Sequence, residues 1–185
     1  MVRSGSANGR GKDRRRGTCH AVQGDGGIER TENTWFMTEL KFQKAGTADA
    51  LILNCISKQS FDSDTQVGAP SPGGPPGYMS LKFHMKMARS NHLYKLSENG
   101  LIVGGAILFL SGDTLNIGRI FISPEHFRKG YGTYMMREIE AMHPEAKTFT
   151  LDTPAWNVRT NSFYAKLGYT LVKRSDEFNC YSKVR

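Results

Sequence analysis

The chain has 185 residues and a formal net charge of +8. This length favours a single domain, and no apolar run reaches the roughly 18 residues of a membrane-spanning helix, so we expect no membrane partner. The three cysteines lie far apart without a C-x-x-C pair, which predicts neither a disulfide framework nor a zinc site and favours a reducing, cytoplasmic location. The positive charge fits nucleic acid, a polyphosphate cofactor or a general bias toward basic residues.

Residues 1–36 are rich in Gly, Ser, Arg and Asn and show no apolar periodicity. Such a segment cannot bury enough apolar surface to offset the entropy of ordering it, so a disordered basic leader is predicted. The run Arg14-Arg15-Arg16 leaves a nucleic-acid-binding arm as the alternative. Ordered patterning begins at Met37, and the folded domain is therefore predicted to span residues 37–185.

The first elements of this domain are a strand and two helices. Alternating side chains predict a strand over residues 40–44, and Thr47 is expected to cap a helix that fades near Ser57 to Phe61. A Gly- and Pro-rich loop over residues 66–77 follows, as a linker or as the wall of a pocket. A second helix is predicted over residues 79–88. Its apolar members are Leu81, Met85 and Met87.

Three strands come next, over residues 92–96, 101–110 and 115–122. Asn99-Gly100 between the first two suits a type I′ hairpin turn, and Ser111-Gly112-Asp113 marks the second turn. Short turns of this kind join antiparallel strands, so a three-stranded antiparallel meander is predicted.

The last part of the chain alternates helices and strands. The predicted elements are a helix from near Gly130, a strand over 148–152, a helix over 157–167 that ends at Gly168, and strands over 169–172 and 178–183. The complete order is β-α-α-β-β-β-α-β-α-β-β, which predicts a mixed α/β (α+β) layer fold.

The stretch from Ile120 to Met136 carries the strongest signal for a ligand. Its β-prone start ends at Pro124, which cannot donate to a strand ladder. A short basic loop with two glycines, Arg128 to Gly132, leads into a helix. Free N–H groups and the helix dipole converge at such a junction, and glycine lets a ligand approach the backbone closely. The stretch therefore predicts an anion-binding site.

Two motifs carry a resemblance to a known family. The run Phe127-Arg128-Lys129-Gly130-Tyr131-Gly132 resembles the Arg/Gln-x-x-Gly-x-Gly/Ala loop of the GNAT N-acetyltransferases. Residues 157–169 resemble that family's Asn-x-x-Ala-x-x-x-Tyr-x-x-x-Gly-Phe pattern, with Thr160 in place of Ala and Tyr169 in place of Phe. Phe127 departs from the loop pattern, which has Arg or Gln there. The resemblance runs from about Leu40 to Ser182. It implies acetyl-CoA as cosubstrate, no metal, and a mixed, mostly antiparallel central sheet flanked by helices.

The resemblance also implies roles for individual residues. The implied cofactor-binding residues are Ile120, Phe121, Ile122, Phe127, Arg128, Lys129, Gly130, Tyr131, Gly132, Thr133, Asn157 and Tyr164. The loop would hold the pyrophosphate through backbone N–H groups, and main-chain groups of residues 120–122 would pair with the pantetheine arm. Tyr164 would protonate the departing thiolate, and otherwise it is a core tyrosine. Asn157 is a helix N-cap that the resemblance also places on the pantetheine arm.

The general base and the acceptor site are less well marked. The predicted strand over 115–122 holds no carboxylate, so Asp152 at the end of another strand is the candidate base, or else a turn residue before Pro154. A water chain would serve as well. Weaker candidates are His84, His92 and His126. Asp152, Trp156 and Tyr78 are candidates for binding the acceptor, because aromatic rings can hold an ammonium group by cation–π contact. No cluster has metal-ligand spacing, and no Ser-His-Asp set stands out.

These features predict an acetyl-CoA-dependent N-acetyltransferase that transfers the acetyl group directly to a primary amine of a small molecule or peptide. The alternatives are a non-catalytic acyl-CoA-binding module and, ranked last, a nucleic-acid-binding protein with a basic arm. The sequence leaves homodimer formation open.

Overall fold

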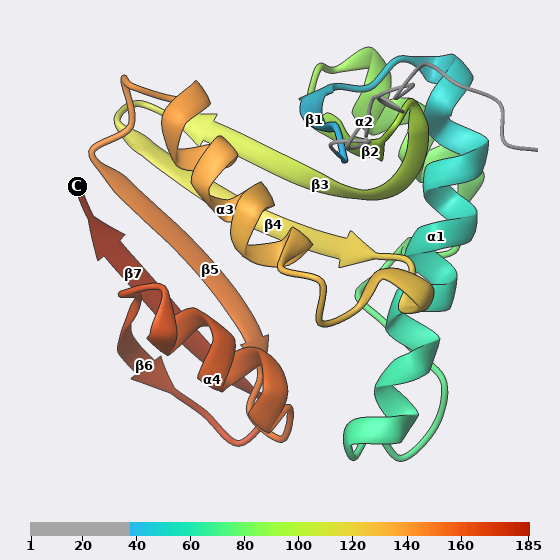
Figure 1. Cartoon of the computed structure of the whole chain (residues 1–185). Coiled ribbons are helices and arrows are strands. Elements are labelled where there is room, and N and C mark those ends of the chain that lie inside the picture. Colours follow the sequence, from blue (N-terminus) through green and yellow to red (C-terminus); the bar gives the residue numbers. More distant parts are fainter. Residues whose placement is uncertain (1–37) are drawn as a thin grey trace, which may run out of the picture. The chain divides into compact units, whose positions relative to one another are not determined.

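A computed structural model describes residues 38–185, and the leader predicted for residues 1–36 lies outside them. Seven strands form one sheet in the order β1-β2-β3-β4-β5-β7-β6 (Figure 1). The strands are β1 (Leu40–Lys44), β2 (Leu93–Glu98), β3 (Leu101–Ser111), β4 (Thr114–Ile122), β5 (Thr148–Pro154), β6 (Thr170–Arg174) and β7 (Phe178–Val184). The helices are α1 (Ala50–Asp62), α2 (Leu81–Arg89), α3 (Tyr131–Met142) and α4 (Val158–Lys166). Short 3₁₀ turns are η1 (Thr47–Asp49), η2 (Ser63–Val67) and η3 (Pro124–His126).

The predicted element order and the mixed, mostly antiparallel sheet are confirmed. Only β4 and β5 pair in parallel; the other neighbouring strands of the described sheet are antiparallel. The predicted type I′ turn is present, because both Asn99 (φ 49°) and Gly100 (φ 85°) adopt positive φ. Both residues tolerate this conformation, which fixes the β2–β3 register locally.

The helix predictions need correction at their boundaries. Thr47 does not cap the first helix; the Asp49 side chain accepts from the Gly46 N–H at 2.8 Å, one turn before α1. The helix does not fade near Ser57 to Phe61 but continues to Asp62. Ser80 caps α2, and Leu81 is exposed, whereas His84 is fully buried on the inner side of that helix.

Helices cover the sheet on both faces, and each face has its own apolar core. One core joins α1 and α2 to the sheet through Leu53, Ile56, Met87, Ile107 and Phe121. The other joins α3 and α4 to the opposite face and is the larger. Its members include Leu115, Ile117, Met135, Ile139, Phe149, Leu151, Tyr164 and Tyr181. The α3/α4 face and the α1/α2 face are thus separated by a single layer of strands.

A β-bulge at Gly118 changes the alternation of β4. Ile107 of β3 pairs with Arg119 and Leu108 with Ile117, so Gly118 is the extra residue. Before the bulge, Leu115 and Ile117 face α3 and α4; after it, Ile120 and Ile122 do. Phe121 then points into the core under α1 and α2. The bulge therefore bends β4 and leaves an unpaired peptide at Gly118.

Strands β4 and β5 diverge after three pairs. Residues 114–116 of β4 pair with residues 148–150 of β5, and the pairing stops there. Figure 1 shows the two strands separating toward their C-terminal ends. Since β5 then pairs only with β7 among the described strands, residues 117–122 of β4 present backbone N–H and C=O groups with no strand beside them on that side. This edge is available for a ligand that can hydrogen-bond like a strand.

The core under α3 and α4 is expected to dominate the stability of the domain. We expect Phe149→Ala to lower the free energy of unfolding by about 3–5 kcal/mol, because Phe149 is 1% exposed and its loss leaves a cavity. Phe178→Ala is the matched control in the adjacent strand, since Phe178 is 44% exposed. Urea unfolding measures both. Equal small effects would contradict the assignment of this core.

Candidate functional site

The segment between β4 and α3 forms an uncapped helix N-terminus. Gly130 occupies the N-cap position of α3 with φ of 83°, and no side chain caps this end. A Cβ at Gly130 would meet no atom within 4 Å, so the space beside its backbone is open. The first N–H groups of α3 are therefore available to a ligand or solvent, and the helix dipole favours an anion there.

Gly132 serves a different purpose from Gly130. The sequence predicts it in the loop, but it lies inside the first turn of α3. A Cβ there would come within 3.2 Å of Phe163 Cζ on α4 and 3.7 Å of Ile122. The missing side chain thus allows α4 and the end of β4 to pack against the beginning of α3.

The side chain of Tyr131 is held inside the protein. Its hydroxyl donates to Glu98, and its ring stacks on His126 at 5.8 Å. His126 Nε2 also lies 3.2 Å from Glu98 Oε2. The hydrogen bond to Glu98 raises the pKa of Tyr131. These contacts fasten the start of α3 to the end of β2, so only the Tyr131 main chain can meet an anion at the helix N-terminus.

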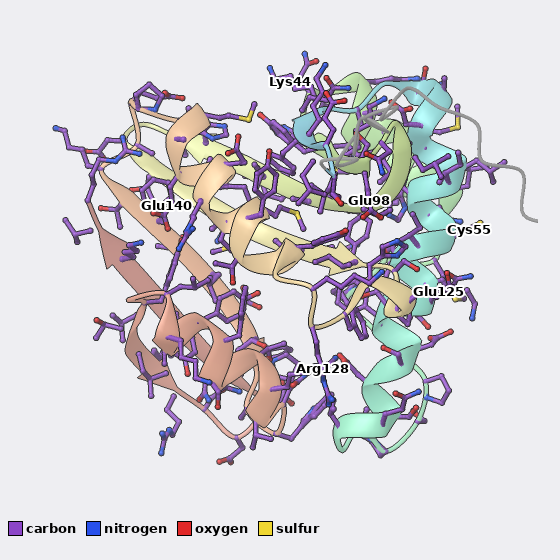
Figure 2. The ribbon with its side chains drawn as sticks, in the orientation of Figure 1. Lys44, Cys55, Glu98, Glu125, Arg128 and Glu140 are labelled. Carbon is purple, nitrogen blue, oxygen red and sulfur yellow. The ribbon has the colours of Figure 1, made fainter. Side chains whose placement is uncertain are left out.

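The loop residues before Gly130 differ in their surroundings. Arg128 adopts φ of 62° and is exposed, and it projects away from α3 (Figure 2). Lys129 is also exposed, and Thr133 is partly buried in the first turn of α3. Phe127 is partly buried, with the Arg159 guanidinium carbon 5.0 Å from its ring centroid. Phe127 is therefore uncharged, and the Arg159 guanidinium group of α4 lies over its ring.

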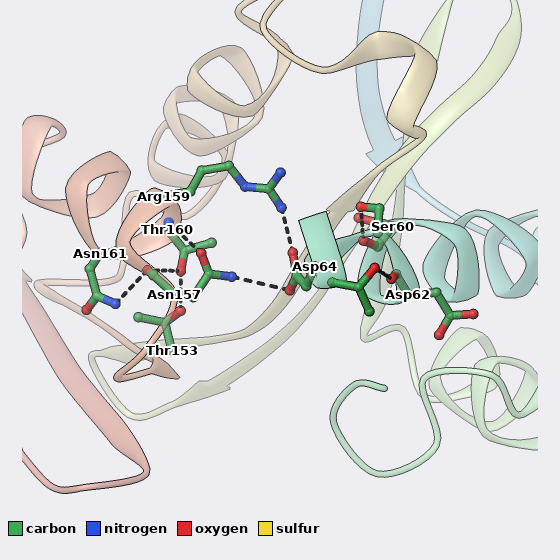
Figure 3. Close-up of polar contacts among 10 residues, drawn as sticks. Ser60, Asp62, Asp64, Thr153, Asn157, Arg159, Thr160 and Asn161 are labelled. Carbon is green, nitrogen blue, oxygen red and sulfur yellow. Dashed lines mark hydrogen bonds and ion pairs between the residues drawn. The ribbon is translucent and has the colours of Figure 1, made fainter. Parts of the chain in front are cut away.

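Asn157 caps α4 and also contacts η2, the turn that follows α1. Its side-chain oxygen accepts from the Thr160 N–H at 3.2 Å, and Nδ2 donates to Asp64 Oδ2 at 3.3 Å (Figure 3). Asn157 is 1% exposed. The structure thus has Asn157 as the N-cap, with both ends of its amide engaged within the described part of the chain.

Tyr164 combines a core ring with a free hydroxyl. Its ring lies 5.2 Å from Phe163 and 6.1 Å from both Tyr169 and Tyr181. The residue is 6% exposed, yet its hydroxyl forms no hydrogen bond with residues 38–185. Burial, followed by the charge of Asp152, raises the pKa of the phenol. The Tyr164 hydroxyl is therefore a neutral O–H donor on the buried side of α4, without a partner in the described part of the chain.

The three predicted acceptor residues lie in three different segments. Asp152 is exposed on β5, where it pairs with Cys180, and its charge acts on Tyr164. Trp156, 40% exposed, lies between β5 and α4. Tyr78 lies in the Gly- and Pro-rich loop and donates to Asp62 Oδ1 at 2.9 Å. The structure brings Asp152 near Tyr164 and ties Tyr78 to the end of α1.

The Gly- and Pro-rich loop is packed on the domain. Tyr78 meets the Phe61 ring of α1 edge-on at 5.9 Å. Arg119 of β4 donates to the Pro76 carbonyl at 2.5 Å and lies over Phe83 at 4.5 Å. The sequence left this loop as either a linker or the wall of a pocket. These contacts favour the wall of a pocket. Arg119 belongs to no recognisable motif, so its contacts are not predictable from the sequence.

Asp64 is a charged residue of this region that no sequence motif marks. Its Oδ1 lies 2.5 Å from Arg159 Nη2, and its Oδ2 accepts from Asn157 (Figure 3). Burial raises the pKa of Asp64, although the Arg159 charge and the hydrogen bonds from Asn157 and Arg159 oppose this. The contact joins residues more than 90 positions apart, so no local pattern could have indicated it.

Other surface features lie away from these residues. A hollow of about 270 Å³ lies over β1 and β2 and contains none of the predicted site residues. Its lining residues are Glu39, Lys41, Gln43, Lys95, Ser97, Gly100 and Ile102. Within residues 38–185, no three His, Cys, Asp or Glu side chains gather as metal ligands would. No helix in the same range is long and apolar enough to cross a membrane.

Comparison with known proteins identifies the fold. Residues 89–171 match the family model described as the acetyltransferase (GNAT) domain. No curated protein matches the chain by sequence. The structure is similar to the PaiA N-acetyltransferase of Thermoplasma acidophilum in complex with coenzyme A, at 15% identity and a TM-score of 0.68, covering 80% of this chain and 99% of that one.

Two further solved structures share this fold. A GNAT-family acetyltransferase from Streptococcus agalactiae has 16% identity and a TM-score of 0.69, covering 79% of this chain and 95% of that chain. The ribosomal-protein-S18-alanine N-acetyltransferase of Escherichia coli has 16% identity and a TM-score of 0.57, covering 78% and 91%. The expected mixed, mostly antiparallel GNAT sheet is thereby confirmed.

Proposed function

Residues 89–171 belong to the GNAT acetyltransferase domain family, and on this premise we propose that the chain transfers the acetyl group of acetyl-CoA to a primary amine. The observation that carries the proposal is the pairing of an uncapped α3 N-terminus with the unpartnered hydroxyl of Tyr164 on α4. The two helices cover the same face of the sheet and touch where Phe163 packs against Gly132. An anion-binding site and a proton donor thus lie on one side of the β4 edge.

The described residues fit coenzyme A. Backbone N–H groups at the start of α3, with open space at Gly130, suit the pyrophosphate. Arg128 and Lys129 are exposed beside it and add positive charge. The unpaired edge of β4, residues 117–122, offers the pantetheine amides the hydrogen bonds that a neighbouring strand would make.

The proposed reaction is direct attack by the amine on the thioester. Holding the amine and the thioester side by side removes most of the entropic cost of their encounter. A backbone N–H near the Gly118 bulge is suited to stabilise the developing oxyanion, because the bulge leaves a peptide unpaired. Tyr164 then donates its proton to the departing sulfur. Its raised pKa keeps the phenol protonated until that charge develops.

The two alternative functions, an acyl-CoA-binding module and a nucleic-acid-binding protein, use fewer features of the site than the enzyme does. A non-catalytic acyl-CoA-binding module requires the α3 N-terminus but assigns no role to the Tyr164 hydroxyl, which has no hydrogen-bond partner among residues 38–185. A nucleic-acid-binding protein would rely on the basic leader, which lies outside the described residues. The free hydroxyl of Tyr164 therefore favours the enzyme.

The location and assembly of the protein stay predictions. A cytoplasmic site of action rests on the cysteine pattern, and Cys55 and Cys180 are free thiols in the described part. Homodimer formation is likewise a prediction.

A screen for thiol release tests the proposed function. The full chain is incubated with acetyl-CoA and amino acids, polyamines, aminoglycosides or peptides with free N-termini. We expect amine-dependent release of free CoA thiol with at least one class, and calorimetry should show acetyl-CoA binding. Binding without release across the whole panel would instead support the non-catalytic module.

A further inference from the structure

Asp64 reaches α4 from the opposite layer of the domain. It lies in η2, directly after α1, and α1 packs on the face of the sheet that α3 and α4 do not cover. Its carboxylate nevertheless contacts Asn157 and Arg159 at the start of α4 (Figure 3). Asp64 therefore bridges the two halves of the sheet at the end where β4 and β5 diverge.

Asp64 meets α4 at its first turn, and Tyr164 lies further along the same helix. Asn157 and Tyr164 are seven residues apart, about two turns or roughly 10 Å along a helix axis, so they share a face. Side chains on a helix lean toward its N-terminus, which directs the Tyr164 hydroxyl back toward Asn157 and Asp64. Asp64 therefore contacts the beginning of the helix that carries the nearly buried Tyr164.

The reaction needs a proton acceptor as well as a proton donor. β4 carries no carboxylate between Thr114 and Ile122, and Asp152 is exposed on β5. Asp64 is largely shielded, with a side-chain exposure of 15%, and approaches from the layer opposite to α3. Among the described carboxylates it is the one that contacts the start of α4, at the end where β4 and β5 diverge.

From this geometry we propose that Asp64 holds the attacking amine and accepts its proton. The inference rests on the proposed function. The amine nitrogen forms a bond to the acetyl carbon and the carbon–sulfur bond breaks. The nitrogen loses one proton to the Asp64 carboxylate, directly or through a water, and sulfur gains one from Tyr164. Asp64 then returns a proton to the tyrosinate through solvent, so that protons balance over the cycle.

The electrostatic surroundings of Asp64 suit this task. Burial raises its pKa, which makes it a better proton acceptor than an exposed aspartate. Arg159, from α4, is the charged group that faces it and works in the opposite direction. Asp62, two residues earlier in its own segment, is paired with Lys58 and bonded to Tyr78. The carboxylate must be ionised to act, so activity should fall as pH drops through the pKa of Asp64.

A purely structural clamp between η2 and α4 makes a different prediction. If the contact only holds η2 to α4, Asp64→Asn and Arg159→Gln both break the ion pair, and both should lower activity without shifting the kcat–pH profile. A proton acceptor is lost only in Asp64→Asn. In Arg159→Gln the carboxylate remains and loses a nearby positive charge, so its pKa rises and the acidic limb of the kcat–pH profile moves to higher pH.

The test compares three variants with the amine that gives the fastest thiol release in the screen. We expect Asp64→Asn to lower kcat by about 100-fold or more, with the KM for acetyl-CoA within roughly twofold of wild type. Arg159→Gln should keep a plateau kcat well above that of Asp64→Asn, with its acidic limb shifted upward. Asp62→Asn, the matched loss of a neighbouring carboxylate, should retain the wild-type kcat. Thermal unfolding confirms that each variant is folded.

Three results would overturn either the role of Asp64 or the proposed function. A folded Asp64→Asn variant with the wild-type kcat overturns the inference while leaving the proposed function intact. Equal losses in Asp64→Asn and Arg159→Gln with unshifted profiles also overturn it in favour of a clamp. A wild-type chain that binds acetyl-CoA but acetylates no amine contradicts the proposed function itself.

Discussion

Tyr164→Phe is expected to lower kcat by about 100-fold or more while leaving the Kd for acetyl-CoA nearly unchanged. A general acid supplies roughly 10²–10⁴-fold of rate, and the phenol is the donor that the site offers to the departing thiolate. The aromatic ring, which packs against Phe163, Tyr169 and Tyr181, stays in the variant. Steady-state thiol release measures kcat, and calorimetry measures the Kd for acetyl-CoA.

The stability of this variant separates catalysis from packing. Because the Tyr164 hydroxyl has no hydrogen-bond partner in residues 38–185, its removal should leave the free energy of unfolding unchanged or slightly raised. Tyr181→Phe is the matched control: Tyr181 is equally buried, but its hydroxyl donates to Asn161 Oδ1 at 2.9 Å. That variant should lose about 1 kcal/mol of stability and keep its kcat. Full activity in Tyr164→Phe would make Tyr164 a core residue only.

Gly130→Val is expected to raise the Kd for acetyl-CoA by about 100-fold. The new side chain would occupy the open space beside the α3 N-terminus, where the pyrophosphate is proposed to bind. Losing even one or two hydrogen bonds to a charged group, at about 1.5–3 kcal/mol each, accounts for such a change. Calorimetry with the folded variant measures it.

The control for this variant lies at the other end of β4. Gly112, in the β3–β4 turn, also has a positive φ, 59°, and no atom within 4 Å of an added Cβ. Gly112→Val should therefore cost similar backbone strain without changing the Kd for acetyl-CoA. If Gly130→Val bound acetyl-CoA as tightly as Gly112→Val, the loop would have no part in cofactor binding.

Local signals in the sequence account for most of the fold. Alternating side chains predict β1, and the turns at Asn99-Gly100 and Ser111-Gly112-Asp113 predict the meander, because both patterns depend only on neighbouring residues. Gly168, with φ of 85°, ends α4 as its position indicated. Predicted helix boundaries are less accurate than the order of the elements. They depend on side chains outside the helix, such as Asp49 before α1.

Other features depend on contacts between distant parts of the chain. The bulge at Gly118 appears only when β4 is aligned with β3, since one glycine in a strand is otherwise ambiguous. The insertion of β7 between β5 and β6 is likewise a matter of pairing. The loop and Tyr164 were found from motifs, whereas Asp64, Arg119 and Arg159 became visible only through the residues that they contact.

The most direct test of the central claim follows the acetyl group itself. Acetyl-CoA labelled with ¹³C in the acetyl carbonyl is incubated with the full chain and the amine panel, and mass spectrometry locates the label. Acetyl transfer predicts labelled amide on an amine nitrogen, with one CoA thiol released for each amide formed. Intact labelled thioester with every amine, under conditions where calorimetry shows acetyl-CoA bound, would contradict it.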